Sequence, residues 1–287
     1  MITLKNAKYV MELSNVGAEI HSLINTQQGN QYIWNGDPAF WGRHTPLLFP
    51  VTGPLPDGHI QVQGKSYPMP VNGFARDMPF QVLSHTETEA VFLLSSNEET
   101  KAFYPFDFSL QVTHTLLDDG YRSTAQIKAN EQLWCTFGWH PAFSLDMNQN
   151  GADLSTFVVE FEQEESVDRL YPVNGIFKTE KQFLHHQKTL QLSRTETDKG
   201  PIVLNGLRSA WVKLSSTQGK HSVTVQRADM PTLVIWTKEQ LHAQFICVEP
   251  MYSFQDAARN PELSKMEGML HLAAGESRTF SNAFTFN

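Results

Sequence analysis

An alternation of apolar and polar residues between positions 106 and 128 most constrains how this chain can fold. Apolar side chains occupy every second position from Phe106 to Val112, which is the period of a strand with one buried face. Asp119-Gly120 then supplies a turn signal, and the alternation resumes at Tyr121. The segment therefore predicts an antiparallel β-hairpin.

Similar short apolar runs recur along the chain, separated by Gly, Asn, Asp and Pro clusters. These runs are 90–96, 156–163, 211–216, 222–228, 232–237, 244–250 and 278–286. Helical periodicity is brief, and residues 260–270 are the clearest candidate for a helix. No internal repeat and no low-complexity linker divides the chain. The pattern predicts an all-β protein, a large antiparallel β-sandwich that forms a single domain over residues 1–287.

Charge and cysteine content exclude several classes of protein. The 22 Lys and Arg residues against 30 Asp and Glu give a net charge of −8, which argues against a nucleic acid as partner. Cys135 and Cys247 both lie in apolar runs, so we expect two buried free thiols rather than a disulfide or a CxxC metal pattern. The N-terminus lacks a signal-peptide pattern, and no window approaches the ~20 apolar residues of a membrane span. We expect a soluble cytoplasmic protein.

Residues 34–80 differ from the rest of the chain because they are dense in Trp, Phe, Pro and Gly. Loops of this composition suit a polar ligand that needs flat apolar faces and hydrogen bonds at its edges. Such loops can also simply cap one end of a sandwich, and composition alone does not choose between the two.

His140 and Glu249 are the residues best suited to chemistry. His140 stands between Trp139 and Pro141 in an apolar run, where a histidine is either a satisfied core residue or a catalyst. Glu249 ends an apolar strand just before Pro250 and would be costly to bury as an unpaired charge. On opposite sides of a small cavity, the two would make a general acid and base working near pH 7.

Other reaction types lack their sequence patterns. There is no HExxH, and His185-His186 lies in a polar stretch that we expect at the surface, so a metal is not expected. No GxSxG, Walker-type loop or GxGxxG is present, which removes support for a serine nucleophile, phosphoryl transfer and dinucleotide binding. No cofactor is expected.

Six segments in register together resemble one family, the aldose 1-epimerases or galactose mutarotase-like proteins, in particular their LacX-type branch. The segments are NVGAEIHSL (15–23), YIWNGDPAFWGRHTPLLFPVTG (32–53), NGFARDMPF (72–80), TFGWHPAFSL (136–145), LVIWTK (233–238) and FICVEPMYSFQDA (245–257). The resemblance extends from near residue 1 to the Gly275-Glu276 turn. It implies a large antiparallel β-sandwich with a sugar site on the face of one sheet, without metal or organic cofactor.

The resemblance also implies roles for individual residues. A histidine at the position of His140 protonates the ring oxygen of the sugar, and a glutamate at the position of Glu249 takes the proton from the anomeric hydroxyl. The ring opens, the C1 carbonyl turns about the C1–C2 bond, and reclosure gives the other anomer. For these roles Glu249 needs to be ionised and His140 protonated at rest, so we expect them to bracket a pyranose rather than form a closed ion pair.

The resemblance further places Arg43, Arg76 and Trp236 at the site. The arginines can hold sugar hydroxyls or a phosphate, or can instead tie loops to carboxylates such as Asp77. Trp236 can offer its face to the apolar side of a pyranose, or can be part of the core.

Two departures from the family concern substrate binding. Asn72 stands where the family commonly has histidine, and an amide cannot carry a proton as imidazole does. The sugar-binding aspartate of the family aligns with Gly200, and Asp198 would replace it only if the loop shifts. The leading interpretation is a mutarotase for a hexose or hexose phosphate. The alternative is a carbohydrate-binding protein without catalysis on the same scaffold, and either would be a monomer or a dimer.

Overall fold

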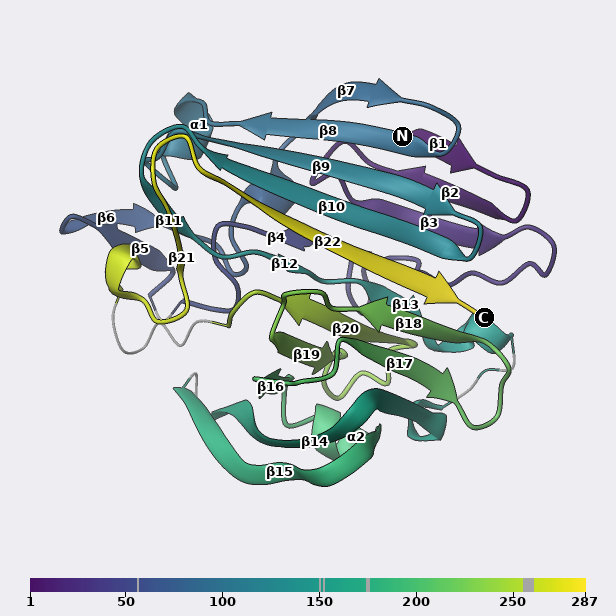
Figure 1. Ribbon diagram of the computed structural model, residues 1–287. Helices are drawn as coiled ribbons and strands as arrows, with labels where there is room; N and C mark the ends of the chain where they lie inside the picture. The colour runs from purple at the N-terminus through teal and green to yellow at the C-terminus, as the bar shows by residue number, and fades with distance from the viewer. Residues whose placement is uncertain (56, 150, 152, 174–175, 255–260) are drawn as a thin grey trace.

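A computed structural model describes residues 1–55, 57–149, 151, 153–173, 176–254 and 261–287 (Figure 1). The predicted hairpin is confirmed: β9 (Phe108–Leu117) and β10 (Gly120–Ala129) pair antiparallel, with Leu117 opposite Gly120. Every second side chain of β9 is buried, as the alternation of its residues requires. The last strand, β22 (Ser277–Phe286), pairs with the other edge of β10.

The hairpin belongs to one 15-stranded antiparallel sheet, and the predicted all-β architecture is confirmed. Its strands run in the order β4-β12-β20-β19-β16-β14-β17-β18-β22-β10-β9-β8-β7, with β13 paired to β20 and β15 to β14. The further strands of this sheet are β4 (Leu47–Leu48), β7 (Gln81–His85), β8 (Glu89–Ser95), β12 (Gly138–Trp139), β13 (Ala142–Ser144), β14 (Phe157–Val173), β15 (Ile176–Gln191), β16 (Ile202–Asn205), β17 (Trp211–Ser216), β18 (Ser222–Gln226), β19 (Thr232–Trp236) and β20 (Phe245–Met251).

Smaller sheets and short helices complete the structure. The strands are β1 (Ile2–Lys5), β2 (Tyr9–Leu13) and β3 (Ile20–Asn25) in one sheet, β5 (His59–Val62) with β6 (Lys65–Pro68), and β11 (Leu133–Cys135) with β21 (Leu270–Leu272). The helices are α1 (Glu98–Lys101) and α2 (Arg194–Thr197), with 3-10 turns η1 (Ala75–Asp77), η2 (Leu145–Asn148), η3 (Leu154–Thr156) and η4 (Leu263–Lys265). Each predicted apolar run forms a strand of the large sheet.

The large sheet curls so that its two halves face each other across the core. Side chains around β12 and β13 pack against β22: the Phe137 ring stacks on Phe280 with centroids 5.4 Å apart. The indole nitrogen of Trp139 donates a hydrogen bond to Oδ1 of Asn282, 3.1 Å away. This closure makes the sandwich, and Figure 1 shows its two layers, β7 to β10 with β22 above and β14 to β20 below.

The prediction of a helix over residues 260–270 is wrong for residues 261–270. Position 260 lies outside the described residues. Only η4 is helical, as a single 3-10 turn, and the segment ends in β21. Leu263 and Met266 are both buried, so the spacing of apolar residues reflects the three-residue period of a 3-10 turn. Gly268, at φ +80°, lies in the left-handed region and ends any helical continuation.

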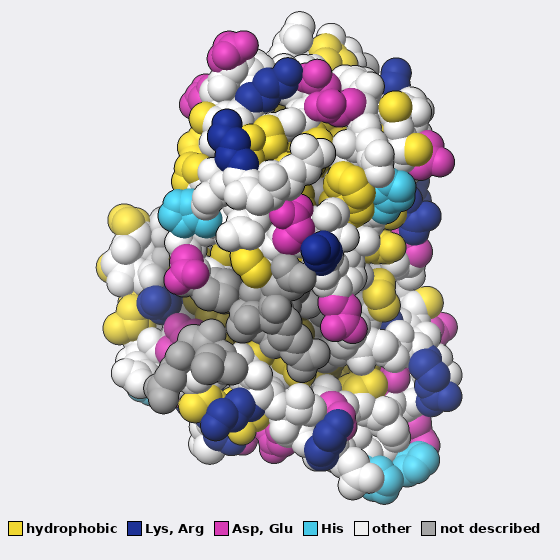
Figure 2. Space-filling model, turned by 90° about the vertical axis from the view of Figure 1, so that its left-hand side faces the viewer, with side chains coloured by type: hydrophobic (Ala, Val, Ile, Leu, Met, Phe, Trp, Pro, Cys, Tyr) yellow, Lys and Arg dark blue, Asp and Glu magenta, His cyan; other side chains and the backbone are white. Residues whose placement is uncertain are grey.

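The surface and the thiols agree with the composition. Figure 2 shows acidic and basic side chains interspersed over one face of the molecule. Both cysteines are buried and free, as expected. Among the residues that the structure describes, no helix has the length and apolar character needed to cross a bilayer.

Candidate active site

A cavity of about 430 Å³ opens over β19 and β20 and contains all six residues proposed from the sequence. Its lining comprises Trp41, Arg43, Gly53, Pro54, Val71, Asn72, Arg76, His140, Pro172, Phe177, Pro201, Val234, Trp236, Glu239, Glu249, Met251 and Phe254. The volume suits a small ligand. Loops from the aromatic segment 34–80 form one wall, which favours the ligand-binding interpretation of that segment.

The backbone of the sheet positions both proposed catalytic residues. Glu249 lies in β20 opposite Val234 of β19, and its neighbour Val248 donates a backbone hydrogen bond to the carbonyl of Pro141. His140 connects β12 to β13, and its N–H donates to the carbonyl of Pro46, 2.9 Å away. Neither side chain depends on a flexible loop for its placement.

The two side chains touch, and the expected separation is therefore wrong. Nε2 of His140 lies 3.5 Å from Oε2 of Glu249, with side chains only 9% and 2% exposed. The expectation assumed that the pair must span a whole pyranose. The ring oxygen and the anomeric oxygen are both bonded to C1, so two groups that are close together can reach both oxygens from one side.

The pKa shifts of the pair oppose the expected charges. Burial lowers the pKa of the His140 imidazole to about 3, and the positive charges of Arg76 and Arg43 act in the same direction. Burial raises the pKa of the Glu249 carboxyl well above its usual value. Both shifts favour a neutral imidazole beside a protonated carboxyl group over an ion pair.

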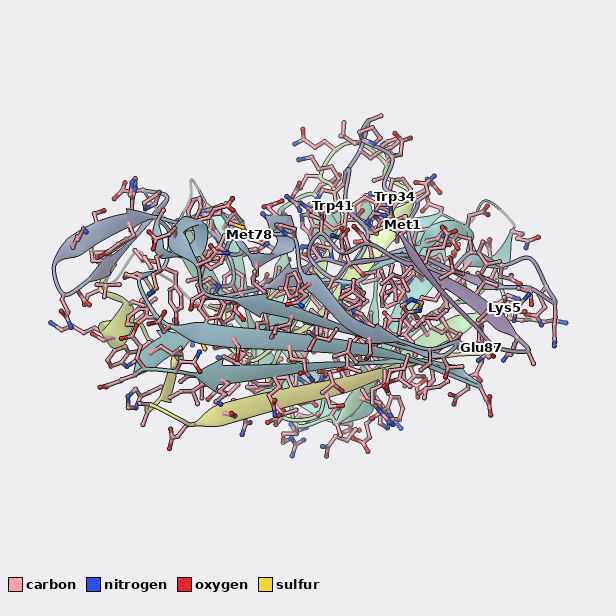
Figure 3. The ribbon with its side chains drawn as sticks, turned by 90° about the horizontal axis from the view of Figure 1, so that it is seen from above. Met1, Lys5, Trp34, Trp41, Met78 and Glu87 are labelled. Atoms are coloured by element: carbon pink, nitrogen blue, oxygen red, sulfur yellow. The ribbon has the colours of Figure 1, made fainter. Side chains whose placement is uncertain are left out.

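Two tryptophans hold the imidazole. Trp41 stacks on His140 with ring centroids 5.0 Å apart, and Trp236 meets it edge-on at 5.6 Å. Trp34 supports this wall because its indole nitrogen donates to the carbonyl of Trp41, and Figure 3 shows the two residues next to each other. Trp139, the sequence neighbour of His140, points into the core instead.

Arg43 and Arg76 both line the cavity, and both are also tied to the protein. Nη2 of Arg43 lies 2.8 Å from Oδ1 of Asp77, and Nη2 of Arg76 donates to the carbonyl of Val71. Burial and the neighbouring Arg43 lower the pKa of Arg76 to about 10, so the group remains charged at neutral pH. The loop-tying role and the site-facing placement therefore coexist.

Asn72 has a structural reason to be asparagine. Its φ of +65° lies in the left-handed region, which asparagine tolerates better than most residues. Its Oδ1 accepts a hydrogen bond of 2.6 Å from the N–H of Gly53, so the side chain joins two loops of the cavity wall. The amide nitrogen is the part of this side chain that can serve a ligand.

Asp198 does not take the place of the sugar-binding aspartate that aligns with Gly200. It caps α2, accepts a hydrogen bond from the backbone N–H of Gln240, and is absent from the cavity lining. The lining carboxylate near this wall is Glu239, whose Oε1 accepts a hydrogen bond of 2.8 Å from the indole nitrogen of Trp236. Sequence reasoning missed Glu239, although it follows LVIWTK directly.

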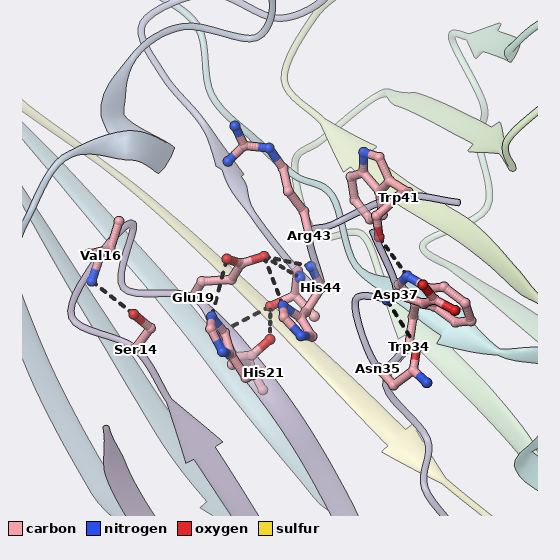
Figure 4. A network of polar contacts seen from close by, with 12 residues as sticks. Ser14, Val16, Glu19, His21, Trp34, Asn35, Asp37, Trp41, Arg43 and His44 are labelled. Carbon is pink, nitrogen blue, oxygen red and sulfur yellow. Dashed lines mark hydrogen bonds and ion pairs between the residues drawn. The ribbon is translucent and has the colours of Figure 1, made fainter. Parts of the chain in front are cut away.

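Glu19 is a second residue that sequence reasoning missed. Its Oε1 accepts hydrogen bonds from the backbone N–H groups of His44 and Thr45, which anchors the loop that carries Trp41 and Arg43 (Figure 4). Burial alone would raise the pKa of Glu19, but the contacts with His21 and with the His44 backbone outweigh it and hold the pKa low. The motif NVGAEIHSL contains Glu19, but no sequence pattern indicates that this residue binds the loop at His44 and Thr45.

The fold and the cavity define a β-sandwich protein with a buried histidine–glutamate pair in a hollow of its sheet. The family model described as aldose 1-epimerase matches residues 1–285. The chain belongs to the aldose 1-epimerase family.

Several relatives cover most of the chain. The protein LacX of Lactococcus lactis subsp. lactis, encoded on the chromosome, is 27% identical over 261 residues, or 87% of this chain and 86% of that protein. A galactose mutarotase-like protein from Lactobacillus casei is 29% identical, covers 100% of both chains and superposes with a TM-score of 0.92. A galactose mutarotase-related enzyme from Lactobacillus acidophilus is 26% identical over 100% of this chain and 97% of its own, with a TM-score of 0.93.

Proposed function

We propose that this protein is a mutarotase that interconverts the α and β anomers of a hexose or hexose phosphate. The observation that carries the proposal is the buried contact between His140 and Glu249 in a cavity of about 430 Å³. The proposal includes His140 as the acid toward the ring oxygen and Glu249 as the base toward the anomeric hydroxyl. It also includes the expected cytoplasmic setting.

The protonation state of the pair fits a reaction that runs in both directions. Ring opening takes one proton from the anomeric hydroxyl and gives one to the ring oxygen. An imidazolium that donates and a carboxylate that accepts end this step as neutral imidazole and carboxylic acid. The directions of the two pKa shifts favour this neutral form at rest, and the neutral form is complementary to the open-chain aldehyde.

Opening a closed sugar requires the same proton to be on His140 instead, with Glu249 as the carboxylate. The contact of 3.5 Å is short enough for the proton to pass from Glu249 to His140 after a small shift of the side chains. Hydrogen bonds from sugar hydroxyls to the carboxylate favour its ionised form. Each well-placed acid or base typically contributes about 10² to 10⁴-fold to the rate.

The remaining lining residues supply substrate contacts in this proposal. Arg43, Arg76 and the amide of Asn72 donate hydrogen bonds to hydroxyl or phosphate oxygens. The face of Trp236 packs on the C–H groups of the sugar, with Glu239 fixing the indole.

The test follows the approach to anomeric equilibrium of freshly dissolved α-glucose and α-galactose by polarimetry, and of glucose 6-phosphate by NMR. His140→Gln and Glu249→Gln keep the size of the side chains and remove the proton transfer. His85→Gln and Glu12→Gln change exposed residues outside the cavity and serve as matched controls. Acceleration by the wild type and both controls, and none by the two site variants, is the expected result.

The alternative function is sugar binding without catalysis. It is favoured by Asn72, which cannot assist a proton transfer, and by the absence of Asp198 from the lining. Saturable sugar binding by calorimetry, with no acceleration of any of the three sugars, would replace the mutarotase proposal with this one.

A further inference from the structure

Cys247 is a buried nucleophile beside the acid–base pair that the proposed reaction does not use. It lies two residues before Glu249 in β20, so both side chains project from the same face of the strand. One donor atom from each of His140, Cys247 and Glu249 lies within 4.8 Å of the other two, and all three residues are buried. Imidazole, thiol and carboxylate thus converge at the base of the cavity.

The spacing of these atoms is close to that of a tetrahedral metal site. Bonds of about 2.0 to 2.3 Å from Zn²⁺ to N, O and S place neighbouring ligand atoms roughly 3.3 to 3.8 Å apart. The nitrogen and the carboxylate oxygen are 3.5 Å apart, within this range. His140 and Glu249 line the cavity, so an ion can enter from it and keep a fourth position open toward it.

One polar atom at this point is not satisfied by the protein. Oε1 of Glu249, next to the Oε2 that meets Nε2 of His140, is buried and has no hydrogen-bond partner among the described residues. A buried polar atom without a partner costs free energy that a bound ligand recovers. A cation is the ligand that suits an imidazole, a carboxylate and a thiolate together.

A second cluster, formed by Glu19, His21 and His44, lacks this geometry. The rings of His21 and His44 are stacked, with centroids 4.1 Å apart and planes 16° from parallel. In-plane lone pairs of stacked imidazoles run side by side and do not converge on one ion. The carboxylate of Glu19 is also occupied by two backbone N–H groups, which agrees with its role as a loop anchor (Figure 4).

We propose that His140, Cys247 and Glu249 form a binding site for a thiophilic divalent cation of the Zn²⁺ class. The ion occupies the same two side chains that the proposed reaction needs, so metal and sugar exclude each other. Zn²⁺ then acts as a reversible inhibitor at the active site. The competition with sugar rests on the proposed function, whereas metal binding itself does not.

The direct test titrates metal-free protein with Zn²⁺ against a chromophoric chelator, and with Co²⁺ under an absorption spectrometer. The wild type is expected to bind one ion per chain and to give the thiolate-to-cobalt charge-transfer band. Cys247→Ala is expected to remove the band and to weaken Zn²⁺ binding about tenfold or more. Cys135→Ala removes the other buried thiol and is the matched control, which keeps both signals.

The outcomes separate the site from weak binding at surface histidines. Absence of the band in both the wild type and Cys135→Ala overturns the proposal, even if Cys247→Ala fails to fold. Equal Zn²⁺ affinity of the wild type and a folded Cys247→Ala also overturns it.

A second measurement connects the metal to the reaction. Zn²⁺ is expected to slow mutarotation competitively with sugar, and to do so about tenfold less effectively in Cys247→Ala, each protein being compared with its own metal-free rate. A chelator restores the rate. If the wild type shows no mutarotation, the proposed function fails while the cobalt band still decides the metal site, so the two failures are distinguishable.

Discussion

Nε2 of His140 and Oε2 of Glu249 lie 3.5 Å apart, and the backbone of β20 and its partners fixes both residues. In the proposed reaction, removing either group from this pair leaves the sugar with an acid or a base but not both. His140→Gln and Glu249→Gln are each expected to lower kcat/KM by about 10² to 10⁴-fold. The double variant should lose little more than either single one, because the two residues act as a unit. A double variant whose loss of kcat/KM equals the product of the two single losses would contradict this prediction.

The same pair predicts an unusual dependence of activity on pH. Burial lowers the pKa of His140 to about 3 and raises that of Glu249, and we expect the free protein to keep one proton on the pair across the neutral range. We expect kcat/KM, corrected for the uncatalysed rate, to be level between about pH 5 and 7, where an ordinary histidine would titrate. Activity should fall only when the last proton leaves at higher pH. An inflection near 6.5 in the profile would show that His140 titrates normally.

Glu249 is expected to reduce stability as the pH rises. Its pKa is raised in the folded protein, so folding is favoured while the carboxyl keeps its proton and is penalised above the unfolded pKa. Glu249→Gln carries no such penalty. The variant should be more stable than the wild type at pH 8 and similar to it at pH 4.5, because only the wild type loses stability between these two pH values. Urea unfolding of both proteins at both pH values measures their free energies of unfolding. The same stability difference between variant and wild type at pH 4.5 and pH 8 would refute the prediction.

The hydrogen bond between Glu239 and Trp236 predicts an effect on substrate binding. Glu239→Ala frees the indole and is expected to raise KM about three- to tenfold with a smaller change in kcat. Glu239→Gln keeps an oxygen that accepts the indole N–H, so its KM should remain near that of the wild type. Equal effects of the two substitutions would indicate that the charge of Glu239, rather than its hydrogen bond, matters.

Glu19 predicts a loss of stability at a distance from the acid–base pair. Glu19→Ala removes the acceptor of two backbone N–H groups and is expected to lower the free energy of unfolding by about 2 to 4 kcal/mol. Glu12→Ala, on the exposed face of β2, should change it by less than about 0.5 kcal/mol. Because Glu19 anchors the loop of Trp41, KM should also rise in Glu19→Ala, which activity assays on the folded fraction can measure.

The local sequence pattern predicted most of the strands because a half-buried strand requires apolar and polar residues to alternate along the sequence. The hairpin of β9 and β10 is the clearest example, with alternation throughout β9 and from Tyr121 onward in β10. The helix expected over 260–270 failed because apolar residues three apart fit a single 3-10 turn equally well.

The site was harder to predict than the fold. His140 and Glu249 could be found because polar residues in apolar runs are conspicuous, but their contact depends on how β12, β13 and β20 pair. Trp41 contacts His140, which is distant in the sequence, and Glu239 contacts Trp236 because the chain turns back after β19. No local sequence pattern predicts contacts of either kind. The charges of the pair could not be foreseen either, since they depend on burial.

The backbone hydrogen bonds that hold His140 and Glu249 separate the geometry of the reaction from the choice of substrate. The pair is fixed by the ladder between strands, whereas Arg43, Asn72, Pro172 and Glu239 reach the cavity from connecting segments or strand ends. Segments of this kind tolerate insertion and replacement far better than a central strand does. A scaffold built in this way can diverge toward new sugars by exchanging its rim while the proton-transfer centre stays unchanged.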